Sequence, residues 1–339
     1  MNILITLDYE LFYDKNPNLE NSIINPTNEI LKIVDPLNVK LILFVDVGYL
    51  KCLEKHKSEF PELEKDYQLI TLQLKELCDN GHEVQLHIHP HWEDSYYDGK
   101  EWYFDLTRYK LTDFSKEEIH NIVTEYTEIL HRITQQKLTA FRAGGWSAQP
   151  FEVIGEALHK NGILYDTSVY PRGALKSKEQ WYDFKNIGFQ KSRWNFSNDL
   201  TQEDPKGHFT EVAISALKVL PFFFWRFVVV RLLKIPEHVS ISKGSALPPS
   251  KLHILKQLLW PSYSVVSIDG FKASYLEKAF QFYKKKNLQD FVIIGHPKAF
   301  TPFSMKIFKK FIEKEKRSQD VKVFSDLEKK HPKLRLKKY

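Results

Sequence analysis

Short apolar runs alternate with helix-like patterns along most of the chain, and this alternation predicts the architecture. The apolar runs predict buried strands at residues 2–7, 39–45, 83–88, 138–143 and 291–296. Apolar positions at helical spacing predict helices such as residues 62–79 and 115–134, and Ser115 with Glu118 has the spacing of a capping box at the start of the second. Strands that alternate with helices form parallel sheets, either open or closed into a barrel.

One long stretch, at about residues 175–262, breaks this rhythm. It is irregular, rich in Trp and Phe, and contains the sequence LKVLPFFFWRFVVVRLLKIP. We interpret it as an insertion within a single domain that spans residues 1–339. The chain ends in a basic tail at about residues 328–339, and tails of this kind are usually solvated.

The apolar part of that stretch, residues 216–235, has two interpretations. Four basic residues interrupt it, namely Lys218, Arg226, Arg231 and Lys234. No uncharged run therefore approaches the roughly 18 to 20 residues that a bilayer span requires. One interpretation is a helix that packs on the main domain and covers one side of a cleft. The other is an interfacial helix, with aromatic rings in the lipid and basic residues at anionic headgroups, which predicts peripheral membrane contact.

Composition and charge narrow the class of protein. The chain of 339 residues is 42% hydrophobic, enough for a sizeable core, and its net charge of +6 is mild, so we expect no nucleic-acid partner. The two cysteines, Cys52 and Cys78, cannot form a disulfide framework and suit a reducing compartment. The N-terminus lacks a basic region and a cleavage site, so we expect no signal peptide. We therefore expect a cytoplasmic location, peripheral to the inner membrane face if the apolar segment is interfacial.

Polar side chains with catalytic potential gather where the predicted strands end. They are Asp8 and Glu10 after the first strand, Asp46 after the second, His87, His89 and His91 after the third, Arg142 after a later one and His296 after the last. Each alone has an ordinary structural explanation, such as a helix cap, an ion pair or a buried histidine. Because ligands bind at the carboxyl ends of the strands in parallel α/β architectures, their shared position favours a functional site.

The three histidines at every second position point to a metal. On a continuous strand they would share one face. Pro90 disfavours continuation of a central strand, so we expect a turn that lets His87 and His91 converge while His89 points elsewhere. Two imidazoles and one carboxylate, with an open position for water, form a usual catalytic divalent-metal site. The alternative is a histidine-rich edge that binds no metal.

These motifs resemble those of the polysaccharide deacetylase (NodB-homology, carbohydrate esterase 4-like) family. GHEVQLHIHPH, at residues 81–91, matches that family's Gly-His-Glu-Ile-x-x-His-x-x-x-His motif in type and spacing, and it is the most specific match. FRAGGWS and IIGHP match the third and last motifs, whereas TLDYE stands where the family has Thr-Phe-Asp-Asp-Gly. The matches run in order from residue 4 to residue 297. The resemblance implies a divergent member with a distorted (β/α)7 barrel.

The resemblance also implies how the metal would be held. A divalent ion, with zinc as the expected metal, would be bound by His87, His91 and one carboxylate. The family's adjacent Asp pair is replaced here by Asp8-Tyr9-Glu10. By analogy Asp8 would be the catalytic base and Glu10 the metal ligand, but Asp8 would become the ligand if Glu10 could not reach the ion.

Further roles follow from the same resemblance. Arg142 would orient Asp8 and keep it ionised, a backbone N–H near Gly144 would hold the oxyanion, and His296 would protonate the leaving amine. The remaining candidates for contact with substrate are Tyr9, Asp46, Trp92, Trp146 and Asp166. The aromatic rings among them could stack on a sugar or pack in the core, and Asp166 could position a catalytic group.

The implied activity is removal of N-acetyl groups from an amino sugar of a surface polysaccharide or of its lipid-linked precursor. A carbohydrate or a lipid-linked glycan is therefore the expected partner. One alternative keeps the metal and hydrolyses another non-peptide C–N bond. A second alternative, favoured by the Asp-Tyr-Glu departure, is a catalytically inactive barrel that binds glycans. The sequence predicts no oligomeric state.

Overall fold

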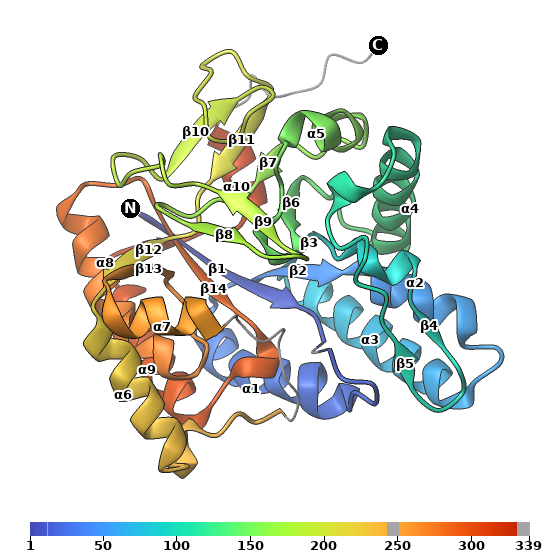
Figure 1. Ribbon diagram of the computed structural model, residues 1–339, viewed down its shortest axis with the longest axis horizontal. Helices are drawn as coiled ribbons and strands as arrows, with labels where there is room; N and C mark the ends of the chain where they lie inside the picture. The colour runs from blue at the N-terminus through green and yellow to red at the C-terminus, as the bar shows by residue number, and fades with distance from the viewer. Residues whose placement is uncertain (12, 243–250, 331–339) are drawn as a thin grey trace.

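Parallel strands form the centre of the molecule and helices surround them (Figure 1). The computed structural model describes residues 1–11, 13–242 and 251–330. Within these residues the main sheet has nine strands, in the order β10-β11-β7-β6-β3-β2-β1-β14, with β15 paired to β1. Their bounds are β1 (Asn2–Tyr9), β2 (Ile42–Asp46), β3 (Glu83–Ile88), β6 (Ala140–Ala143), β7 (Tyr165–Asp166), β10 (Arg193–Phe196), β11 (Phe209–Val212), β14 (Asp290–Gly295) and β15 (Asp320–Val321).

The sheet curls into a nearly closed barrel. Its pairs are parallel, apart from the antiparallel pair of β10 and β11. The chain that follows β11 closes the gap between the two ends of the strand order. Ile214 N donates to Val169 O at 2.8 Å, and Ser215 N donates to Val292 O of β14 at 3.0 Å. The predicted distorted barrel is therefore confirmed.

Helices cover the outer side of the barrel. Their bounds are α1 (Asn25–Val34), α2 (Val47–His56), α3 (Pro61–Asp79), α4 (Lys116–Thr134), α5 (Phe151–Lys160), α8 (Leu276–Lys285) and α9 (Pro302–Glu315). α4 begins with the predicted capping box, in which Glu118 N donates to Ser115 Oγ at 3.3 Å and Ser115 N donates to the Glu118 carboxylate at 2.8 Å. The larger apolar core lies between these helices and the strands, and it includes Ile3, Ile5 and Leu7 of β1.

A second, smaller apolar layer fills the interior of the barrel at the amino ends of the strands. Leu4, Phe44 and Val292 contribute to it, and α10 (Phe324–Lys330) closes this end with the ring of Phe324. The buried carboxylate of Glu83 accepts from the backbone N–H of Phe324 at 3.1 Å and thereby caps α10. The plugged end leaves the carboxyl ends of the strands as the place where polar side chains can meet.

Part of the stretch predicted as an insertion belongs to the barrel. β10 and β11 join the main sheet, whereas the rest of the stretch forms elements outside it. These are the hairpin of β8 (Ala174–Lys176) and β9 (Trp181–Asp183), the antiparallel pair of β12 (Ala216–Val219) and β13 (Ser262–Val265), and the helices α6 (Pro221–Leu232) and α7 (Lys251–Leu259), which lie between β12 and β13. A four-residue strand without a flanking helix pattern carries too little periodicity to be recognised. Residues 331–339 of the predicted basic tail lie outside the described residues.

A buried ion pair joins β10 to β14. Arg193 donates from Nε and Nη2 to the Asp290 carboxylate at 2.9 and 2.6 Å, and Asn2 Nδ2 of β1 donates to the same carboxylate at 2.8 Å. Asp290 is fully buried and Arg193 is nearly so. The pair therefore connects three strands at the plugged end of the barrel.

Asp290→Ala should lower the free energy of unfolding by about 3–5 kcal/mol, because it leaves the Arg193 guanidinium buried without its counter-charge. Urea denaturation followed by circular dichroism measures this change. The matched control is Glu156→Ala, which removes the exposed i,i+4 pair with Lys160 and should change stability little. Equal effects of the two substitutions would contradict a structural role for the buried pair.

Candidate metal centre and catalytic site

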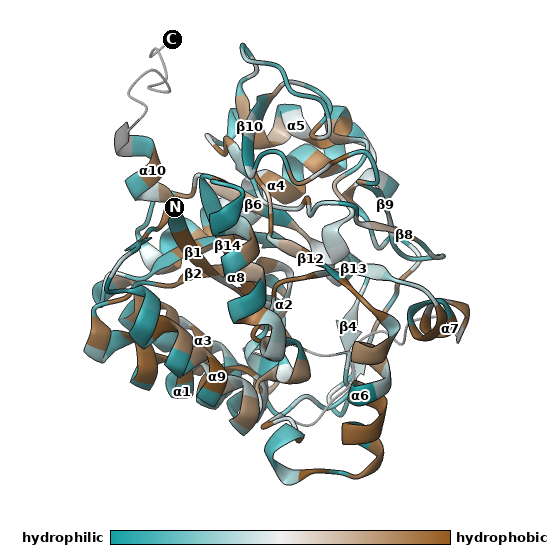
Figure 2. Cartoon of the chain, turned by 90° about the vertical axis from the view of Figure 1, so that its left-hand side faces the viewer, coloured by the Kyte–Doolittle hydropathy of each residue, from teal (hydrophilic) through white to brown (hydrophobic). Residues whose placement is uncertain are grey.

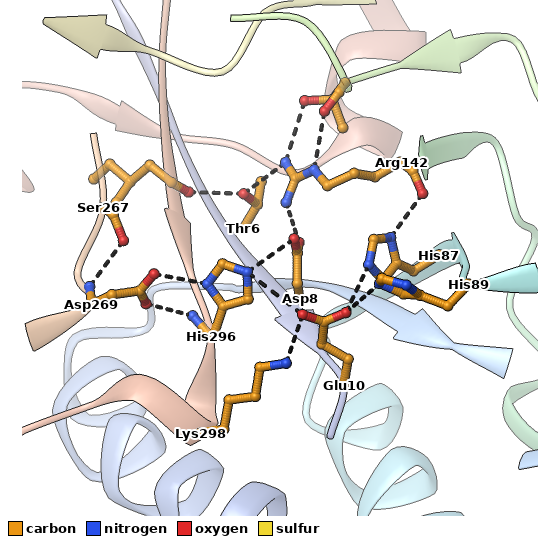
Figure 3. Close-up of polar contacts among 12 residues, drawn as sticks. Thr6, Asp8, Glu10, His87, His89, Arg142, Ser267, Asp269, His296 and Lys298 are labelled. Carbon is orange, nitrogen blue, oxygen red and sulfur yellow. Dashed lines mark hydrogen bonds and ion pairs between the residues drawn. The ribbon is translucent and has the colours of Figure 1, made fainter. Parts of the chain in front are cut away.

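The pleat of β1 places both acidic residues of the Asp-Tyr-Glu motif inside the barrel. Residues two apart in a strand share a face, so Asp8 and Glu10 point inward while Tyr9 points outward. The Tyr9 hydroxyl donates to Gln73 Oε1 of α3 at 2.8 Å, and the ring is only 2% exposed. Tyr9 therefore packs in the outer core, as one of the two interpretations of its ring expected. Glu10 reaches His87 and His89, so Asp8 is not needed as the carboxylate of the metal cluster (Figure 3).

Glu10 lies between two imidazole rings of the third strand. Its Oε2 atom is 3.3 Å from His87 Nε2 and 2.5 Å from His89 Nε2. One ligand atom from each of the three residues can be chosen so that all lie within 4.8 Å of one another. The set of one carboxylate and two imidazoles could hold a divalent metal ion.

The hydrogen bonds of His87 fit the metal-binding tautomer. His87 Nδ1 is 2.8 Å from the backbone carbonyl oxygen of Arg142, which can only accept. Nδ1 therefore carries the proton, and in the neutral ring Nε2 presents its lone pair to Glu10. A hydrogen bond from Nδ1 to a carbonyl is the usual support of a ligating histidine, because it leaves Nε2 for the metal.

Charges around Glu10 and His87 shift both pKa values in the direction of the ionised forms. Burial would raise the pKa of Glu10, but Lys298, His89 and His87 hold it well below its usual range. Burial would lower the pKa of His87, but the bond to Glu10 and the nearby carboxylates of Asp8 and Asp46 raise it above its ordinary value. The negative charges of Glu10, Asp8 and Asp46 therefore lie close to the rings of His87 and His89. A cation site requires such a concentration of negative charge.

His89, and not His91, joins His87 beside Glu10, so the expectation that His89 points elsewhere is wrong. The backbone of His89 stays extended, with φ −107° and ψ 91°, and this keeps His87 and His89 on one face. Gly144 makes room for the ring, because a Cβ atom at this position would lie 2.7 Å from His89 Nδ1. The predicted substrate contact Gly144 thus lies directly behind His89.

The chain turns at Pro90, as predicted, but the turn carries His91 away from Glu10. The 3₁₀ turn η3 begins at Pro90 (Pro90–Glu93) and carries His91 among aromatic rings, with ring centroids 5.2 Å from Tyr13 and 6.0 Å from a parallel Tyr109. His91 is buried, and among the described residues neither of its ring nitrogens has a hydrogen-bond partner. Its ring centroid is 5.6 Å from that of His89, so His91 borders the Glu10 cluster without belonging to it.

Arg142 fixes Asp8 at the floor of the site. Arg142 Nη1 contacts Asp8 Oδ1 in a short ion pair, and Arg142 Nε donates to Thr167 O at 3.0 Å. A further bond runs from Nη2 to Thr6 Oγ1 at 2.9 Å, and the guanidinium lies 4.2 Å above the Phe44 ring. The guanidinium is fully buried and held on every side, so it can hold the Asp8 carboxylate in one orientation. Arg142 therefore lies beside Asp8, as predicted.

His296 faces both carboxylates from β14. Its Nε2 atom is 3.5 Å from Asp8 Oδ2 and 3.7 Å from Glu10 Oε1, and its Nδ1 atom is 2.8 Å from Asp269 Oδ2. Burial would lower the pKa of His296, but the charge and hydrogen bond of Asp269, with Asp8 and Glu10, raise it above its ordinary value. These carboxylates therefore favour the charged form of His296, and its Nε2 atom points into the site.

Two further charged residues of the site, Asp269 and Lys298, were not predicted from the sequence. Asp269 also accepts from the backbone N–H of His296 at 2.8 Å, and Lys298 Nζ is 2.8 Å from Glu10 Oε1 and 2.7 Å from Leu11 O. Asp269 follows the apolar run SVVSI, so the strand-end argument could have found it had the run been read as a strand. For Lys298, two residues after His296, no signal distinguishes it from other lysines.

The remaining candidates lie around the site. Trp92 is only 4% exposed and donates from Nε1 to Asp46 Oδ2 at 2.7 Å, so its ring packs in the core, as one of its two interpretations expected. Asp46 is buried beneath the histidines, and burial raises its pKa. Trp146 is partly buried against Tyr170, with ring centroids 5.2 Å apart.

Asp166 is a supporting residue and not a surface for substrate. It is buried, and it accepts from Ser168 N at 2.9 Å and from Ser168 Oγ at 3.1 Å. Ser168 Oγ in turn accepts from the backbone N–H of Ala143 at 3.0 Å. The predicted contact of Asp166 with substrate is therefore wrong, and the Ala143 N–H is already engaged.

No protein-family model matches the chain, and no curated protein matches its sequence. Solved structures with similar folds do exist. The Puue allantoinase is 13% identical, over 98% of this chain and 91% of its own, with a TM-score of 0.50.

Two further solved structures are more distant by TM-score. A proposed polysaccharide deacetylase from Mycobacterium smegmatis is 14% identical, over 98% of this chain and 91% of its own, with a TM-score of 0.45. A pseudoenzyme of carbohydrate esterase family 4 from Bacillus anthracis is 11% identical, over 96% of this chain and 64% of its own, with a TM-score of 0.40. At these identities a likeness shows the fold alone, and the likeness to the allantoinase supports the distorted barrel that was predicted for this chain.

Proposed function

We propose that the chain is a metal-dependent hydrolase that removes N-acetyl groups from an amino sugar of a surface polysaccharide or of its lipid-linked precursor. The observation that carries this proposal is the convergence of three units at one end of the barrel (Figure 3). They are the Glu10, His87 and His89 cluster, the Asp8–Arg142 pair and the His296–Asp269 pair. Amide hydrolysis needs a polarised carbonyl, a base for water and an acid for the amine, and each unit supplies one of these.

Glu10, His87 and His89 would hold the ion, and a donor set of two imidazoles and one carboxylate suits zinc. The ion would polarise the acetamide carbonyl and lower the pKa of water. His91 is the alternative third ligand, because both of its ring nitrogens lack a partner among the described residues and it borders His89.

Asp8 serves as the base in this proposal. Arg142 occupies its Oδ1 atom, so Oδ2, which faces His296 across 3.5 Å, is the atom that takes the proton of water. The fixed guanidinium prevents the carboxylate from rotating away and balances its charge.

His296 serves as the acid. Asp269 accepts from Nδ1, so in the charged ring the second proton lies on Nε2, which points to the carboxylates of the site. That proton goes to the leaving nitrogen, since an amine leaves poorly unless it is protonated. Because Ser168 engages the N–H of Ala143, an oxyanion contact would fall to the backbone of Gly144 or Gly145.

The fold alone does not specify the substrate, because an allantoinase has a similar fold. A second candidate function is therefore hydrolysis of another non-peptide C–N bond. A screen decides between the two, with N-acetylated sugars and their oligomers in one set and cyclic amides in the other.

The metal-loaded protein should release acetate from at least one N-acetylated amino sugar, and Asp8→Asn should abolish this release at temperatures at which the variant is still folded, although the variant should be less stable because the buried Arg142 loses its counter-charge. Asn keeps the shape of the side chain but cannot take a proton. Enzymatic detection of acetate measures the activity, and circular dichroism verifies the fold. Turnover of cyclic amides alone would replace the proposed substrate, and an Asp8→Asn variant with full activity would exclude Asp8 as the base.

The purified protein should bind about one divalent ion per chain, and His87→Ala should lose most of it. Elemental analysis after loading with zinc measures the content. Loss in His89→Ala but not in His91→Ala would assign the third ligand to His89, and the reverse result would assign it to His91. His131→Ala, which changes an exposed histidine of α4, is the matched control. Equal metal in wild type and His87→Ala would eliminate the site.

Asp269→Asn should move the basic limb of the kcat/KM profile to lower pH by roughly one unit. The charge on Asp269 raises the pKa of His296, so without this charge His296 loses its proton at a lower pH. Activity on a substrate from the screen is followed across the pH range, with Asp79→Asn on the exposed end of α3 as control. A basic limb that stays in place would show that Asp269 does not tune the acid.

A further inference from the structure

α6 carries apolar side chains on the face that it turns to solvent. Phe222, Trp225, Val229 and Leu232 are all exposed, from 49% for Val229 to 75% for Leu232. With 3.6 residues per turn these four positions fall within about 80° of arc, so they form one stripe along the helix. A surface helix ordinarily has polar residues on its outer face.

The opposite face of α6 is also apolar, and it fastens the helix to the barrel. Phe223 is buried, with its ring centroid 5.2 Å from that of Phe271 and 4.6 Å from that of Tyr275. Both partners belong to η7 (Gly270–Tyr275), which directly follows Asp269. The outer stripe therefore cannot be explained as the packing face of the helix, because the packing face is already used.

α7 extends the exposed apolar surface. Trp225 Nε1 of α6 donates to Leu258 O of α7 at 3.0 Å. α7 and the residue that follows it expose Leu252, Ile254, Leu255, Leu259 and Trp260. Figure 2 shows α6 and α7 as largely hydrophobic helices on one side of the molecule, with α10 on the opposite side. We call the exposed side chains of α6, α7 and Trp260 the apolar face.

Positive charge surrounds the apolar face. Residues 216–260 contain seven Lys and Arg and one acidic residue, Glu237. The exposed basic side chains in this part of the described chain include Arg226, Arg231, Lys234 and Lys256. Two copies of the chain that met through this face would bring like charges together, so the charge disfavours a second copy as the occupant.

We propose that the apolar face docks on the surface of an anionic lipid bilayer. Aromatic and aliphatic side chains would enter the boundary between headgroups and acyl chains, and the basic residues would contact the phosphates. Within residues 1–11, 13–242 and 251–330, no helix has both the length and the apolarity to cross a membrane. The surface is independent of the proposed hydrolase activity. The two sequence interpretations of this segment are compatible, because one side of α6 packs and the other is exposed.

Cosedimentation with vesicles tests the proposal on the full chain. The protein should pellet with vesicles that contain phosphatidylglycerol and phosphatidylcholine at low salt, less at high salt, and weakly with phosphatidylcholine alone. Quenching by brominated lipids should report insertion of Trp225 and Trp260, and Trp225→Phe with Trp260→Phe should lose most of that quenching. Absence of binding to the anionic vesicles at low salt would overturn the proposal.

Two pairs of substitutions separate the apolar from the electrostatic contribution. Phe222→Ser with Leu232→Ser should weaken binding by roughly tenfold, since two large side chains no longer leave water. Arg226→Glu with Arg231→Glu should weaken it by at least roughly tenfold, since each basic residue near an anionic surface contributes on the order of fivefold. All four residues are exposed, so the variants should unfold at the same urea concentration as the wild type.

Matched substitutions on α3, on another part of the surface, are the controls. Leu72→Ser removes another exposed apolar side chain, and Lys75→Glu reverses another exposed charge. Neither should change vesicle binding. If the controls weaken binding as much as the α6 variants, the contact is not specific to the apolar face and the proposal fails. The proposal fails equally if analytical ultracentrifugation shows a dimer that the α6 variants dissolve while vesicle binding is absent.

Discussion

The site depends on one buried ion pair, between Arg142 of β6 and Asp8 of β1. Both side chains are out of water, so either charge alone would be strongly destabilising, and each requires the other. The same arginine bonds to Thr6 and to the backbone of Thr167, lies over Phe44, and offers its carbonyl oxygen to His87. Because this one residue contacts β1, β2, β3 and the end of β7, the positions of the proposed base and of one proposed metal ligand are coupled to the closure of the barrel.

The side chains inside the barrel change from apolar to charged along its axis. The amino end holds an apolar layer closed by α10, the middle holds the arginine and its hydroxyl partners, and the carboxyl end holds Glu10 and the histidines. This order lets the apolar layer supply stability while the ionised groups gather at one end. Each anion of the site has a cationic or hydrogen-bonding neighbour, such as Lys298 for Glu10 and His296 for Asp8. The arrangement keeps buried charges compensated and still leaves lone pairs directed to one point.

The segment between β12 and β13 adds a second kind of surface to this barrel. α6 presents apolar side chains on two sides, one to the ring of Phe271 and one to solvent. η7 joins this helix to the site, because Asp269 precedes the residues on which α6 packs. The proposed lipid surface and the candidate site are therefore joined by one short segment, Asp269 with η7.

Much of the architecture could be predicted from the sequence, because it depends on local patterns. The alternation of apolar strands and amphipathic helices indicated parallel strands, in an open sheet or a barrel, and the resemblance of the motifs favoured the barrel. The rule that polar residues gather at strand ends identified Asp8, Glu10, His87, Arg142 and His296. The pleat of a strand is equally local, so the inward direction of Asp8 and Glu10 follows from their spacing of two. β11 was missed because four residues hold too little of a pattern.

Tertiary structure decided what depends on contacts between distant residues. Whether His89 or His91 meets Glu10 turned on the residue at which the chain leaves the strand and on the space that Gly144 provides. Asp269 and Lys298 joined the site because β14 and its neighbours bring them to β1 across more than 250 residues of chain, as the separation of Lys298 from Glu10 by 288 positions shows. The burial of Tyr9 and Trp92 was likewise set by helices that pack on them. Sequence determines which residues can do chemistry, but packing between remote segments determines which of them face the same point.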